Sequence, residues 1–536
     1  MIENKRNIII EVHNLTVGLK GNSTLKLVDD ISFSLKENTI TALLGKSGSG
    51  KTLTALSIMG LVNYIEGIEV EGRLKLKNYA LIDLKSNSTN LRKLRGELIS
   101  MIFQDTFTSF NPSKKCGVQL EEIASYQDAS SKKTKNDILK FMSKIEVDER
   151  LYYSYPHEMS GGQLQRMGII AALITNPVLL IADEPTTNLD ASSRKEVLDL
   201  LLKVKNEFGK SILYISHDLD AVRYVADEII LMKKGELVKD VSKFDFFTRD
   251  KGEKEIVSDF DSIIARNSFD IGANSILEIN NLSKSFSGNR YFPFTKHKKH
   301  DALVNVSFDV KEGDIFGVVG ESGSGKTTIA RLILNLIPPD SGDILFEGKP
   351  VVYSEKDSDF RNDVQIVFQN PLSSLNPALR IRKLLTEAVL SNKREKNISG
   401  IDEKILCLLS MVGLPETILA KTSAQISGGE GQRVAIARAL ALSPKLLILD
   451  ESISSLDREM QFNILKLLLK LKKKHGLTYI FITHDLEVSR AFCNRLIILK
   501  EGRVVESGDV EEIFSKPKHS YTKKLLMSNL QFSDKD

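Results

Sequence analysis

The sequence lacks most of the features that place a protein in a special structural class. Its 536 residues include no tryptophan and only three cysteines, Cys116, Cys407 and Cys493. The cysteines lie far apart and show no paired spacing, so we exclude a zinc or iron–sulfur site built from cysteine pairs. We expect three buried neutral thiols in a protein of a reducing compartment.

Long apolar runs and an excess of one charge are also absent from the sequence. No run reaches the about 18 apolar residues that a membrane-spanning helix needs, so any membrane process would be served from the water side. The N-terminal MIENKRNIIIEV has only a short apolar run, which predicts a strand rather than a signal peptide. The formal net charge of +4 is nearly balanced and gives no argument for nucleic-acid binding.

The strongest organisational feature is an internal repeat of very long period. GKSGSGKT at 45–52 recurs as GESGSGKT at 320–327, and SGGQLQR from Ser160 recurs as SGGEGQR from Ser427. Two Asp-Glu pairs and two His-Asp pairs follow in the same order. Each of these later motifs is separated from its copy by 267 residues, as Ser160 is from Ser427. A chain of this length exceeds one hydrophobic core, and the constant spacing predicts two homologous domains.

The apolar pattern predicts an α/β fold for both domains. Continuous apolar runs at 178–183 and 446–450 suit central strands of a parallel sheet that helices cover on both faces. Helical stretches at 193–206 and 460–474 lie between strands and give a βαβ order. Charged and small polar residues interrupt the pattern between the domains, and a basic insertion, KHKKH at 296–300, reads as a solvated loop.

Both glycine-rich segments have the sequence context of a phosphate-binding P-loop. Each follows a short apolar strand and leads into a helical segment. Glycines let the backbone N–H groups wrap a β-phosphate, and the helix N-terminus adds a favourable dipole. We expect Lys51 and Lys326 to reach the β- and γ-phosphates, and Thr52 and Thr327 to place hydroxyls on Mg²⁺. A glycine turn without function is the alternative, and the repetition argues against it.

An Asp-Glu pair ends each predicted central strand. Side chains at the carboxyl end of a parallel strand point into the ligand crevice of an open α/β sheet, so Asp183 and Asp450 are predicted to complete the Mg²⁺ shell. Glu184 and Glu451 follow, where a carboxylate can polarise the attacking water as a general base. An isolated Asp-Glu pair is more often a solvated strand end, but its place downstream of a P-loop favours the catalytic reading.

The order of P-loop, glutamine loop, SGGQ segment, Asp-Glu pair and lone histidine resembles the ATP-binding cassette of ABC proteins in both halves. The resemblance covers nearly the whole chain, and the Ser-Gly-Gly signature is specific to that family among P-loop proteins. It implies an α/β protein of two tandem P-loop NTPase domains of ABC type, each with a parallel-core sheet, an antiparallel β part and a helical subdomain. It also implies that the cassettes pair head to tail, with each ATP between one P-loop and the opposite signature.

The expected domain boundaries follow the two copies of the repeat. They are 1–240 for the first cassette, 241–274 for a linker, 275–510 for the second cassette and 511–536 for a C-terminal tail. Neither half has lost its glutamate or its histidine, so the resemblance implies two competent ATP sites.

Several residue roles come from the resemblance alone. Gln104 and Gln369 are similar to the loop glutamines that sense Mg²⁺ and the attacking water. His217 and His484 are similar to the switch histidines that contact the γ-phosphate. The segments TNLD at 187–190 and SSLD at 454–457 resemble the D-loops of the family.

The adenine contact differs between the two halves. Phe286 resembles the aromatic residue that stacks on adenine, whereas the first half has Leu19 in this place. The first adenine contact is therefore expected to be weaker or differently built, with Tyr64 or an aromatic residue of the other cassette as alternative sources. The first residue of the signature is also altered, since Met159 and Ile426 replace the usual leucine, and a swap of similar volume should be tolerated.

The candidate residues form three groups. The candidate catalytic residues are Glu184, Glu451, His217 and His484. The candidate ATP-binding residues are Gly45, Lys46, Ser47, Gly48, Ser49, Gly50, Lys51, Thr52, Leu53, Ser160, Gly161, Gly162, Gln163, Phe286, Gly320, Glu321, Ser322, Gly323, Ser324, Gly325, Lys326, Thr327, Thr328, Ser427, Gly428, Gly429 and Glu430. The candidate Mg²⁺ ligands are Thr52, Gln104, Asp183, Thr327, Gln369 and Asp450.

Two further segments narrow the subfamily. FQDTFTSFNP from Phe103 and FQNPLSSLNP from Phe368 are similar to the glutamine-loop sequences of importers for oligopeptides, dipeptides and nickel. IFSKPKHSYTKKLL at 513–526 resembles the tail of those ATPases, with Ser520 in place of the usual proline. The resemblance implies an ATP-hydrolysing motor subunit at the cytoplasmic face of the membrane. Its implied partners are two transmembrane permease subunits and, indirectly, an extracellular solute-binding protein. The expected transported solute is a peptide, with nickel or a metal–chelator complex as the second alternative.

Two other classes of protein remain open. Tandem cassettes also occur in translation factors that act on the ribosome, but these resemble one another in a longer charged helical linker and in a signature without the glutamine of SGGQ. Fused sugar-importer ATPases are nearer, but they usually have one degenerate site and lack the tail found here.

Overall fold

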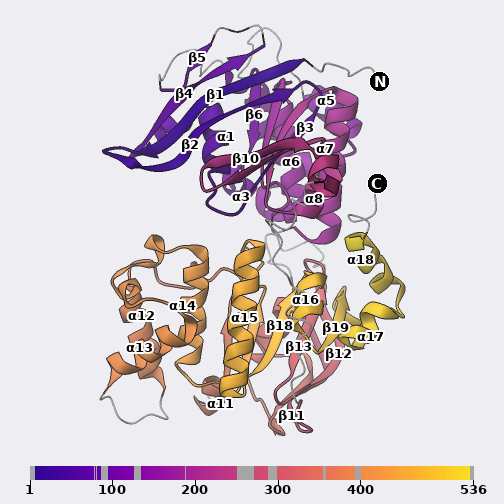
Figure 1. Ribbon diagram of the computed structural model, residues 1–536. Helices are drawn as coiled ribbons and strands as arrows, with labels where there is room; N and C mark the ends of the chain where they lie inside the picture. The colour runs from indigo at the N-terminus through magenta and orange to yellow at the C-terminus, as the bar shows by residue number, and fades with distance from the viewer. Residues whose placement is uncertain are drawn as a thin grey trace. The chain divides into compact units, whose positions relative to one another are not determined.

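The computed structural model describes residues 7–77, 79, 81–85, 94–125, 135–187, 189–249, 271–287, 299–353, 358–392, 400–454 and 456–530. The chain divides into two compact units between Val257 and Ser258. Most of the expected linker and residues 296–298 of the basic insertion lie outside the described residues. Each unit is described by itself below (Figure 1).

The first unit contains two sheets. A four-stranded antiparallel sheet has the order β2-β1-β4-β5, and a six-stranded sheet has the order β10-β9-β3-β8-β7-β6. In the second sheet β6, β7, β8, β3 and β9 are parallel, and β10 is antiparallel to β9. The strands are β1 (Ile8–Leu19), β2 (Asn22–Lys36), β3 (Ile40–Leu44), β4 (Ile68–Leu76), β5 (Ile82–Asp83), β6 (Ile99–Ile102), β7 (Leu179–Asp183), β8 (Ser211–Ser216), β9 (Glu228–Lys233) and β10 (Glu236–Ser242).

The central strands of the first unit are buried on both faces. In β7, Leu180 and Ala182 pack into the core on the helical side, while Leu179 and Ile181 pack into the core shared with the antiparallel sheet. This explains the continuous apolar run, since both faces of a parallel strand are covered.

The helices of the first unit are α1 (Lys51–Ile58), η1 (Val62–Tyr64), α3 (Thr106–Ser109), α4 (Cys116–Ser125), α5 (Lys135–Lys144), η2 (Glu149–Tyr153), η3 (Pro156–Glu158), α6 (Gly161–Leu173), α7 (Ala191–Phe208), α8 (Leu219–Val225) and η4 (Asp245–Arg249).

The second unit repeats this plan. Its antiparallel sheet has the order β12-β11-β14-β15, and its six-stranded sheet has the order β16-β17-β18-β13-β19-β20. The strands are β11 (Ser275–Ser287), β12 (Lys299–Lys311), β13 (Ile315–Gly320), β14 (Ser341–Phe346), β15 (Lys349–Pro350), β16 (Val364–Val367), β17 (Leu446–Asp450), β18 (Thr478–Thr483), β19 (Arg495–Lys500) and β20 (Arg503–Asp509).

The helices of the second unit include the C-terminal pair that follows β20. They are α10 (Lys326–Ile333), α11 (Ser358–Asp363), α12 (Ile381–Ser391), α13 (Ile401–Val412), η6 (Glu416–Ala420), η7 (Ser423–Gln425), α14 (Gly428–Leu440), α15 (Arg458–His475), α16 (Leu486–Phe492), α17 (Val510–Ser515) and α18 (Ser520–Leu530). The expected α/β fold, with its parallel core, antiparallel β part and helical part, is confirmed in both units.

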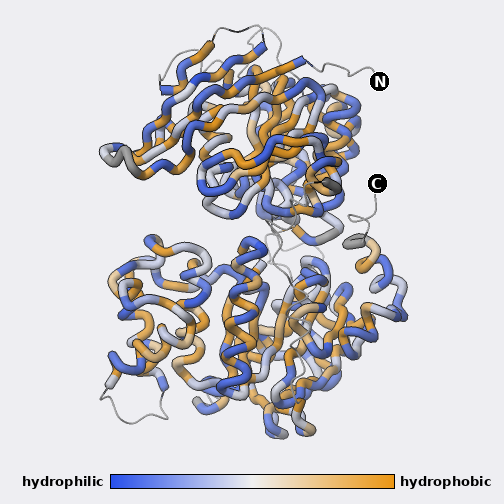
Figure 2. Tube along the Cα trace, viewed as in Figure 1, coloured by the Kyte–Doolittle hydropathy of each residue, from blue (hydrophilic) through white to orange (hydrophobic). Residues whose placement is uncertain are grey.

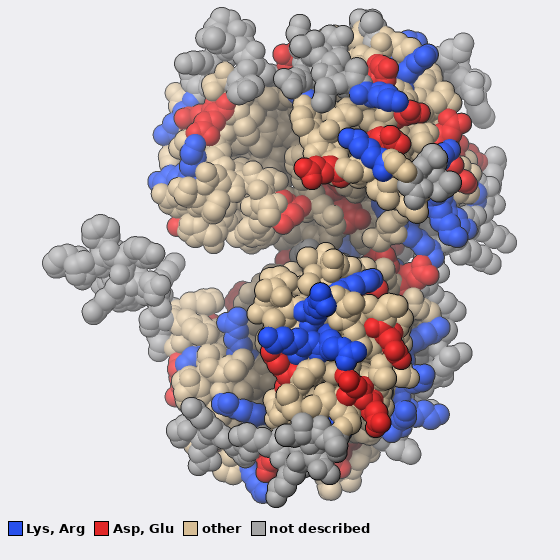
Figure 3. Space-filling view, turned by 90° about the vertical axis from the view of Figure 1, so that its left-hand side faces the viewer, with Lys and Arg blue, Asp and Glu red and all other residues tan. Residues whose placement is uncertain are grey.

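Hydrophobic residues follow the strands of both units, while the outer helices alternate between polar and apolar positions (Figure 2). Among the described residues, no helix is long and apolar enough to cross a membrane. On the face that Figure 3 presents, each unit carries both basic and acidic side chains, so neither has one sign of charge there.

The expectation for the cysteines is wrong at one position. Cys116 and Cys493 are buried, and burial raises the pKa of the Cys116 thiol to about 11. Cys407 is exposed on α13. The helix buries Ile405, Leu408, Leu409 and Val412, which occupy the inward positions of its helical period and leave Cys407 on the outer side.

Candidate nucleotide-binding sites

The first P-loop connects β3 to α1 in a conformation that only glycine accommodates at two points. Gly50 caps α1 with φ 100°, a left-handed conformation. A Cβ atom at Gly45 would lie 2.5 Å from the carbonyl oxygen of Met232 on β9. Lys51 opens the helix, and its Nζ donates to the carbonyl oxygens of Gly45 at 2.8 Å and Lys46 at 3.0 Å. The loop therefore holds a nearly buried ammonium group beneath its own backbone.

The second P-loop has the same construction between β13 and α10. Gly325 caps α10 with φ 105°, and a Cβ atom at Gly320 would lie 2.5 Å from the carbonyl oxygen of Leu499. The Nζ of Lys326 donates to the carbonyl oxygens of Gly320 at 2.7 Å and Glu321 at 2.8 Å. The substitution of Lys46 by Glu321 between the copies leaves this cradle unchanged, because the loop uses backbone atoms at that position.

A threonine hydroxyl and an aspartate carboxylate meet beside each P-loop. The distance from Thr52 Oγ1 to Asp183 Oδ1 is 3.4 Å, and that from Thr327 Oγ1 to Asp450 Oδ1 is 3.5 Å. Asp183 lies on the face of β7 that Leu179 and Ile181 also occupy, which is the face toward α1. Burial raises the pKa of both carboxyl groups to about 6.

These oxygens fit a magnesium ion that is shared with a nucleotide. Mg²⁺ prefers oxygen ligands and is usually held by one or two carboxylates together with substrate phosphates. Within the described part of the chain, no group of three or more His, Cys, Asp or Glu side chains is placed to hold a metal. Each Thr–Asp pair offers part of a shell, which phosphate oxygens would complete.

Three predicted residues of the first half meet at one carboxylate. Gln104 Nε2 donates to Glu184 Oε2 at 2.9 Å, and His217 Nδ1 lies 2.9 Å from Glu184 Oε1. The hydroxyl of Thr187 also donates to Glu184 Oε2 at 3.1 Å. Although burial disfavours its charge, the hydrogen bond with His217 leaves the pKa of Glu184 below the usual value.

The second half assembles the corresponding residues around Glu451. Gln369 Nε2 donates to Glu451 Oε2 at 2.8 Å, and His484 Nδ1 lies 3.5 Å from Glu451 Oε1. Lys326 Nζ is also 3.5 Å from Glu451 Oε1. As in the first half, burial opposes ionisation but the histidine contact leaves the pKa of Glu451 lowered.

Both central glutamates have a left-handed backbone, with φ 47° at Glu184 and φ 45° at Glu451. A residue other than glycine rarely adopts this conformation. It turns each carboxylate out of the strand end and toward the glutamine and histidine. The two glutamates could be predicted from the sequence, but their left-handed backbone could not.

The signature segments begin α6 and α14 with a reciprocal cap. Ser160 Oγ accepts from the N–H of Gln163 at 3.3 Å, and Gln163 Oε1 accepts from the N–H of Ser160 at 2.9 Å. In the second half, Glu430 Oε2 accepts from the N–H of Ser427 at 2.8 Å and from its hydroxyl at 3.0 Å. Each signature serine therefore lies exposed at the N-terminus of a 13-residue helix.

The two halves differ at the expected adenine position. Leu19 and Phe286 occupy corresponding ends of β1 and β11, and their exposed fractions are 36% and 40%. Tyr64, the other aromatic considered in the first half, lies on η1 with the guanidinium of Arg95 5.5 Å from its ring centroid. The lack of an aromatic residue at Leu19 thus remains a real difference between the copies.

One contact at the first site was not foreseen. The sequence placed Thr187 in the D-loop segment, whereas its hydroxyl is a direct partner of Glu184. Its spacing of three residues from Glu184 within one turn could have indicated this contact. The second half has no matching side-chain contact among the described bonds of Ser454, whose hydroxyl donates to the carbonyl oxygen of Glu451 at 2.8 Å. Asn188 and Ser455 of the two D-loop segments lie outside the described residues.

The fold and the two sites define a P-loop NTPase with two nucleotide-binding cassettes in one chain. The family model described as ABC transporter matches residues 28–187 and 303–454. The chain belongs to the ABC transporter family, as an ATP-binding subunit with ATPase activity.

The relatives resemble the chain over nearly its whole length. It is 35% identical to an uncharacterized ABC transporter ATP-binding protein, YejF, of Escherichia coli strain K12, over 97% of this chain and 99% of that protein. It is 35% identical to a peptidoglycan transport ATP-binding protein, also YejF, of Agrobacterium fabrum, over 98% and 97%. It is 32% identical to a glutathione import ATP-binding protein, GsiA, of Pectobacterium atrosepticum, over 98% and 90%.

Proposed function

We propose that the chain is the motor subunit of an ABC importer for peptides or peptide-like solutes, with cassettes at 1–240 and 275–510. The observation that carries the motor role is a pair of side-chain clusters, in each of which a glutamate contacts a glutamine and a histidine. The peptidoglycan and glutathione transport functions of the relatives support a peptide-like solute.

The P-loops bind the triphosphate in this proposal. The N–H groups of 45–50 and 320–325 surround the β-phosphate, and Lys51 and Lys326 turn from the loop carbonyls toward the β- and γ-phosphates. Thr52 with Asp183, and Thr327 with Asp450, would hold Mg²⁺, with Gln104 and Gln369 nearby. When bound, this ion neutralises charge that develops on the phosphate oxygens.

Hydrolysis in this proposal begins with the central glutamates. Glu184 and Glu451 accept a proton from water as its oxygen attacks the γ-phosphorus, and the bond to the β–γ bridging oxygen breaks. Gln104 and Gln369 orient the water, while His217 and His484 hold the carboxylate and contact the γ-phosphate. The lowered pKa of each glutamate keeps the base ionised before the reaction.

We also propose that each signature completes the site built on the P-loop of the other cassette. Support comes from the exposed serine at a helix N-terminus, where N–H groups and the helix dipole favour an anionic γ-phosphate. The first signature contributes Gln163 and the second contributes Glu430. Glu430 adds a negative charge, so the two composite sites should differ electrostatically.

A groove beside the first glutamine loop supports docking of a membrane partner. It has a volume of about 280 Å³ and is lined by Met59, Phe103, Phe110, Ile123 and Ala171, among others. Phe103 is 43% exposed, which is high for a large apolar side chain that is next to Gln104. We propose that a short cytoplasmic helix of one permease subunit occupies this groove, and that a second subunit docks beside Phe368. The chain would then lie at the cytoplasmic face of the membrane, with a solute-binding protein acting on the permease from outside.

Membrane association should depend on the permease. Expressed alone, the chain should remain in the supernatant after ultracentrifugation, and it should sediment with membranes when both permease subunits are co-expressed. Replacing Phe103 with Ser should weaken this sedimentation. The same change at Phe244, which is 64% exposed and lies between β10 and η4, should not. Salt-resistant co-purification with ribosomes would contradict the importer and favour a translation factor.

The two ATP sites should differ in nucleotide affinity. An aromatic side chain under a base is worth roughly 1–3 kcal/mol in nucleic-acid complexes, and even the lower value is a several-fold change in binding. Because Phe286 belongs to the site of Lys326, Lys51→Ala should reduce binding at low ATP less than Lys326→Ala does. Equilibrium titration of a fluorescent ATP analogue into each variant measures this order. Equal losses, or the reverse order, would assign the adenine contact of the first half to another residue.

A further inference from the structure

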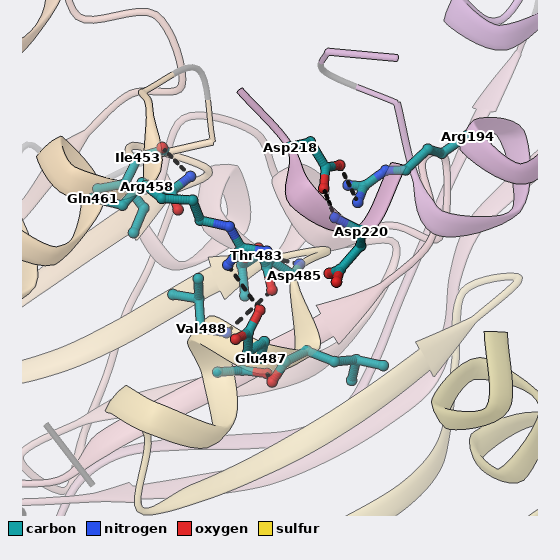
Figure 4. A network of polar contacts seen from close by, with 12 residues as sticks. Arg194, Asp218, Asp220, Ile453, Arg458, Gln461, Thr483, Asp485, Glu487 and Val488 are labelled. Carbon is teal, nitrogen blue, oxygen red and sulfur yellow. Dashed lines mark hydrogen bonds and ion pairs between the residues drawn. The ribbon is translucent and has the colours of Figure 1, made fainter. Parts of the chain in front are cut away.

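An arginine in the first turn of the helix after each D-loop pairs with the aspartate that follows the switch histidine. In the first unit, Arg194 Nη1 lies 3.3 Å from Asp218 Oδ2. In the second unit, Arg458 Nη1 lies 3.6 Å from Asp485 Oδ2 and 2.9 Å from Glu487 Oε2. Figure 4 shows each arginine directed at the carboxylates of its own unit. All four paired side chains of the two Arg–Asp contacts are at most 27% exposed, so water screens them less than surface ion pairs.

The two arginines come from different positions of the repeat. With the separation of 267 residues, Arg194 corresponds to Gln461, and Arg458 corresponds to Ala191. Gln461 is buried, and its Nε2 donates to the carbonyl oxygen of Ile453 at 3.1 Å, as Figure 4 shows. Since this position carries no arginine in the second unit, the guanidinium that reaches Asp485 comes from three residues earlier. The two units therefore make the same Arg–Asp contact from positions that do not correspond in the repeat. Such a repetition argues against a chance pairing of surface charges.

The aspartates also fix the turn that carries the histidine. Asp218 Oδ1 accepts from the N–H groups of Asp220 at 3.0 Å and Ala221 at 3.2 Å, and so caps α8. Its own N–H donates to Ser216 Oγ at 2.9 Å, across His217. In the second unit, Asp485 accepts from Val488 N–H at 3.1 Å and donates to Thr483 Oγ1 at 3.0 Å. These hydrogen bonds tie each aspartate to the turn that contains the histidine, so a displacement of the aspartate should also displace that turn.

The arginines of the two Arg–Asp contacts lie next to the D-loop segments in the chain. Asp190, the last residue of the first D-loop segment, caps α7 by accepting from the N–H of Ser193 at 2.9 Å. Asp457 caps α15 in the same way from the N–H of Met460 at 2.8 Å. Arg194 and Arg458 are therefore held by the turn that ends the D-loop, and they contact the turn that presents the histidine.

We propose that Arg194 and Arg458 are positioning residues that connect the D-loop to the switch histidine within each cassette. A displacement of the D-loop then alters the place of His217 or His484 against Glu184 or Glu451. This inference rests on the proposed role of the switch histidines in hydrolysis. It assigns the arginines no contact with nucleotide, so they should affect turnover and leave ATP binding unchanged.

The test compares Arg194→Met with Arg458→Met, alone and combined, in the full chain. Each single variant should lower kcat by about fivefold, which is the size of effect that interaction energies within one side-chain network produce. KM for ATP and the melting temperature should stay unchanged. Lys203→Met is the matched control, because Lys203 lies on the same helix α7 and pairs with Glu146 at 2.6 Å. Arg194→Lys retains the charge and should restore most of the turnover.

A double-mutant cycle identifies the pathway through the aspartate. Asp218→Asn keeps a good helix cap but removes the charge. Arg194→Met combined with Asp218→Asn should therefore be no slower than the slower single variant. Additive losses, an effect on KM alone, or kcat equal to wild type in Arg194→Met would overturn the inference. His217→Ala separates this failure from that of the proposed function: if His217→Ala keeps full turnover, the assigned role of the histidine is wrong.

Discussion

Replacing Glu184 and Glu451 together by glutamine should abolish ATP turnover while ATP binding is retained. Both carboxylates lie within hydrogen-bond distance of a loop glutamine, and the histidines lie 2.9 Å and 3.5 Å from them. General-base catalysis contributes about 10²–10⁴-fold to rate, and an amide of the same shape removes the base without emptying the site. We expect kcat to fall by at least about 10²-fold with little change in nucleotide affinity.

The chain supplies a close control for this change. Glu146 and Glu347 also have a left-handed backbone, with φ 60° and φ 49°, but they form ion pairs with Lys203 and Lys445 away from the P-loops. Glu146→Gln with Glu347→Gln should therefore leave turnover close to wild type. A catalytic double variant that turned over ATP at the wild-type rate would mean that another group serves as the base.

Replacing the first P-loop glycine of either half by alanine should cause a large loss of nucleotide binding. A Cβ atom at Gly45 or Gly320 would lie 2.5 Å from a backbone carbonyl oxygen, which no rotamer change relieves. Overpacking of this kind costs typically about 1–3 kcal/mol, and the loop must shift away from β9 or β19 to accept it. We expect at least about a fivefold loss of affinity at the altered site, measured by titration of a fluorescent ATP analogue.

Glycines at the ends of α7 and α15 provide the comparison. Gly209 and Gly476 have φ 62° and φ 64°, yet a Cβ atom at either would meet no atom within 4 Å. Gly209→Ala and Gly476→Ala should lower stability through backbone strain and leave nucleotide affinity unchanged. If the P-loop variants bound ATP as tightly as these controls, the loops would not be the phosphate cradles.

The strands and helices that carry each site could be predicted well from the sequence, because local motifs determine them. The apolar runs indicated β7 and β17, which end at Asp183 and Asp450 as expected. The helix predicted at 193–206 begins at Ala191, since the Asp190 cap sets its first turn and lies outside the apolar pattern. The antiparallel and helical parts could be anticipated only from the family resemblance.

Contacts between distant segments could not be predicted from sequence. Gln104 and Glu184 are 80 residues apart, and only the pairing of β6 with β7 brings their strand ends together. The left-handed backbone at Glu184 and Glu451 has no sequence signal, because glutamate does not favour it. The Arg–Asp pairs could not be predicted for a different reason. Arg194 and Arg458 do not occupy corresponding positions of the repeat, so the two halves share no sequence pattern that indicates them.

Uptake of a labelled oligopeptide by cells that lack this chain tests the central claim most directly. Wild-type protein and the Glu146→Gln/Glu347→Gln control should both restore uptake, whereas Glu184→Gln/Glu451→Gln should not, at equal protein levels. Restoration of uptake by the variant without turnover, or no dependence of peptide uptake on the wild-type chain, would contradict a peptide importer driven by these two sites.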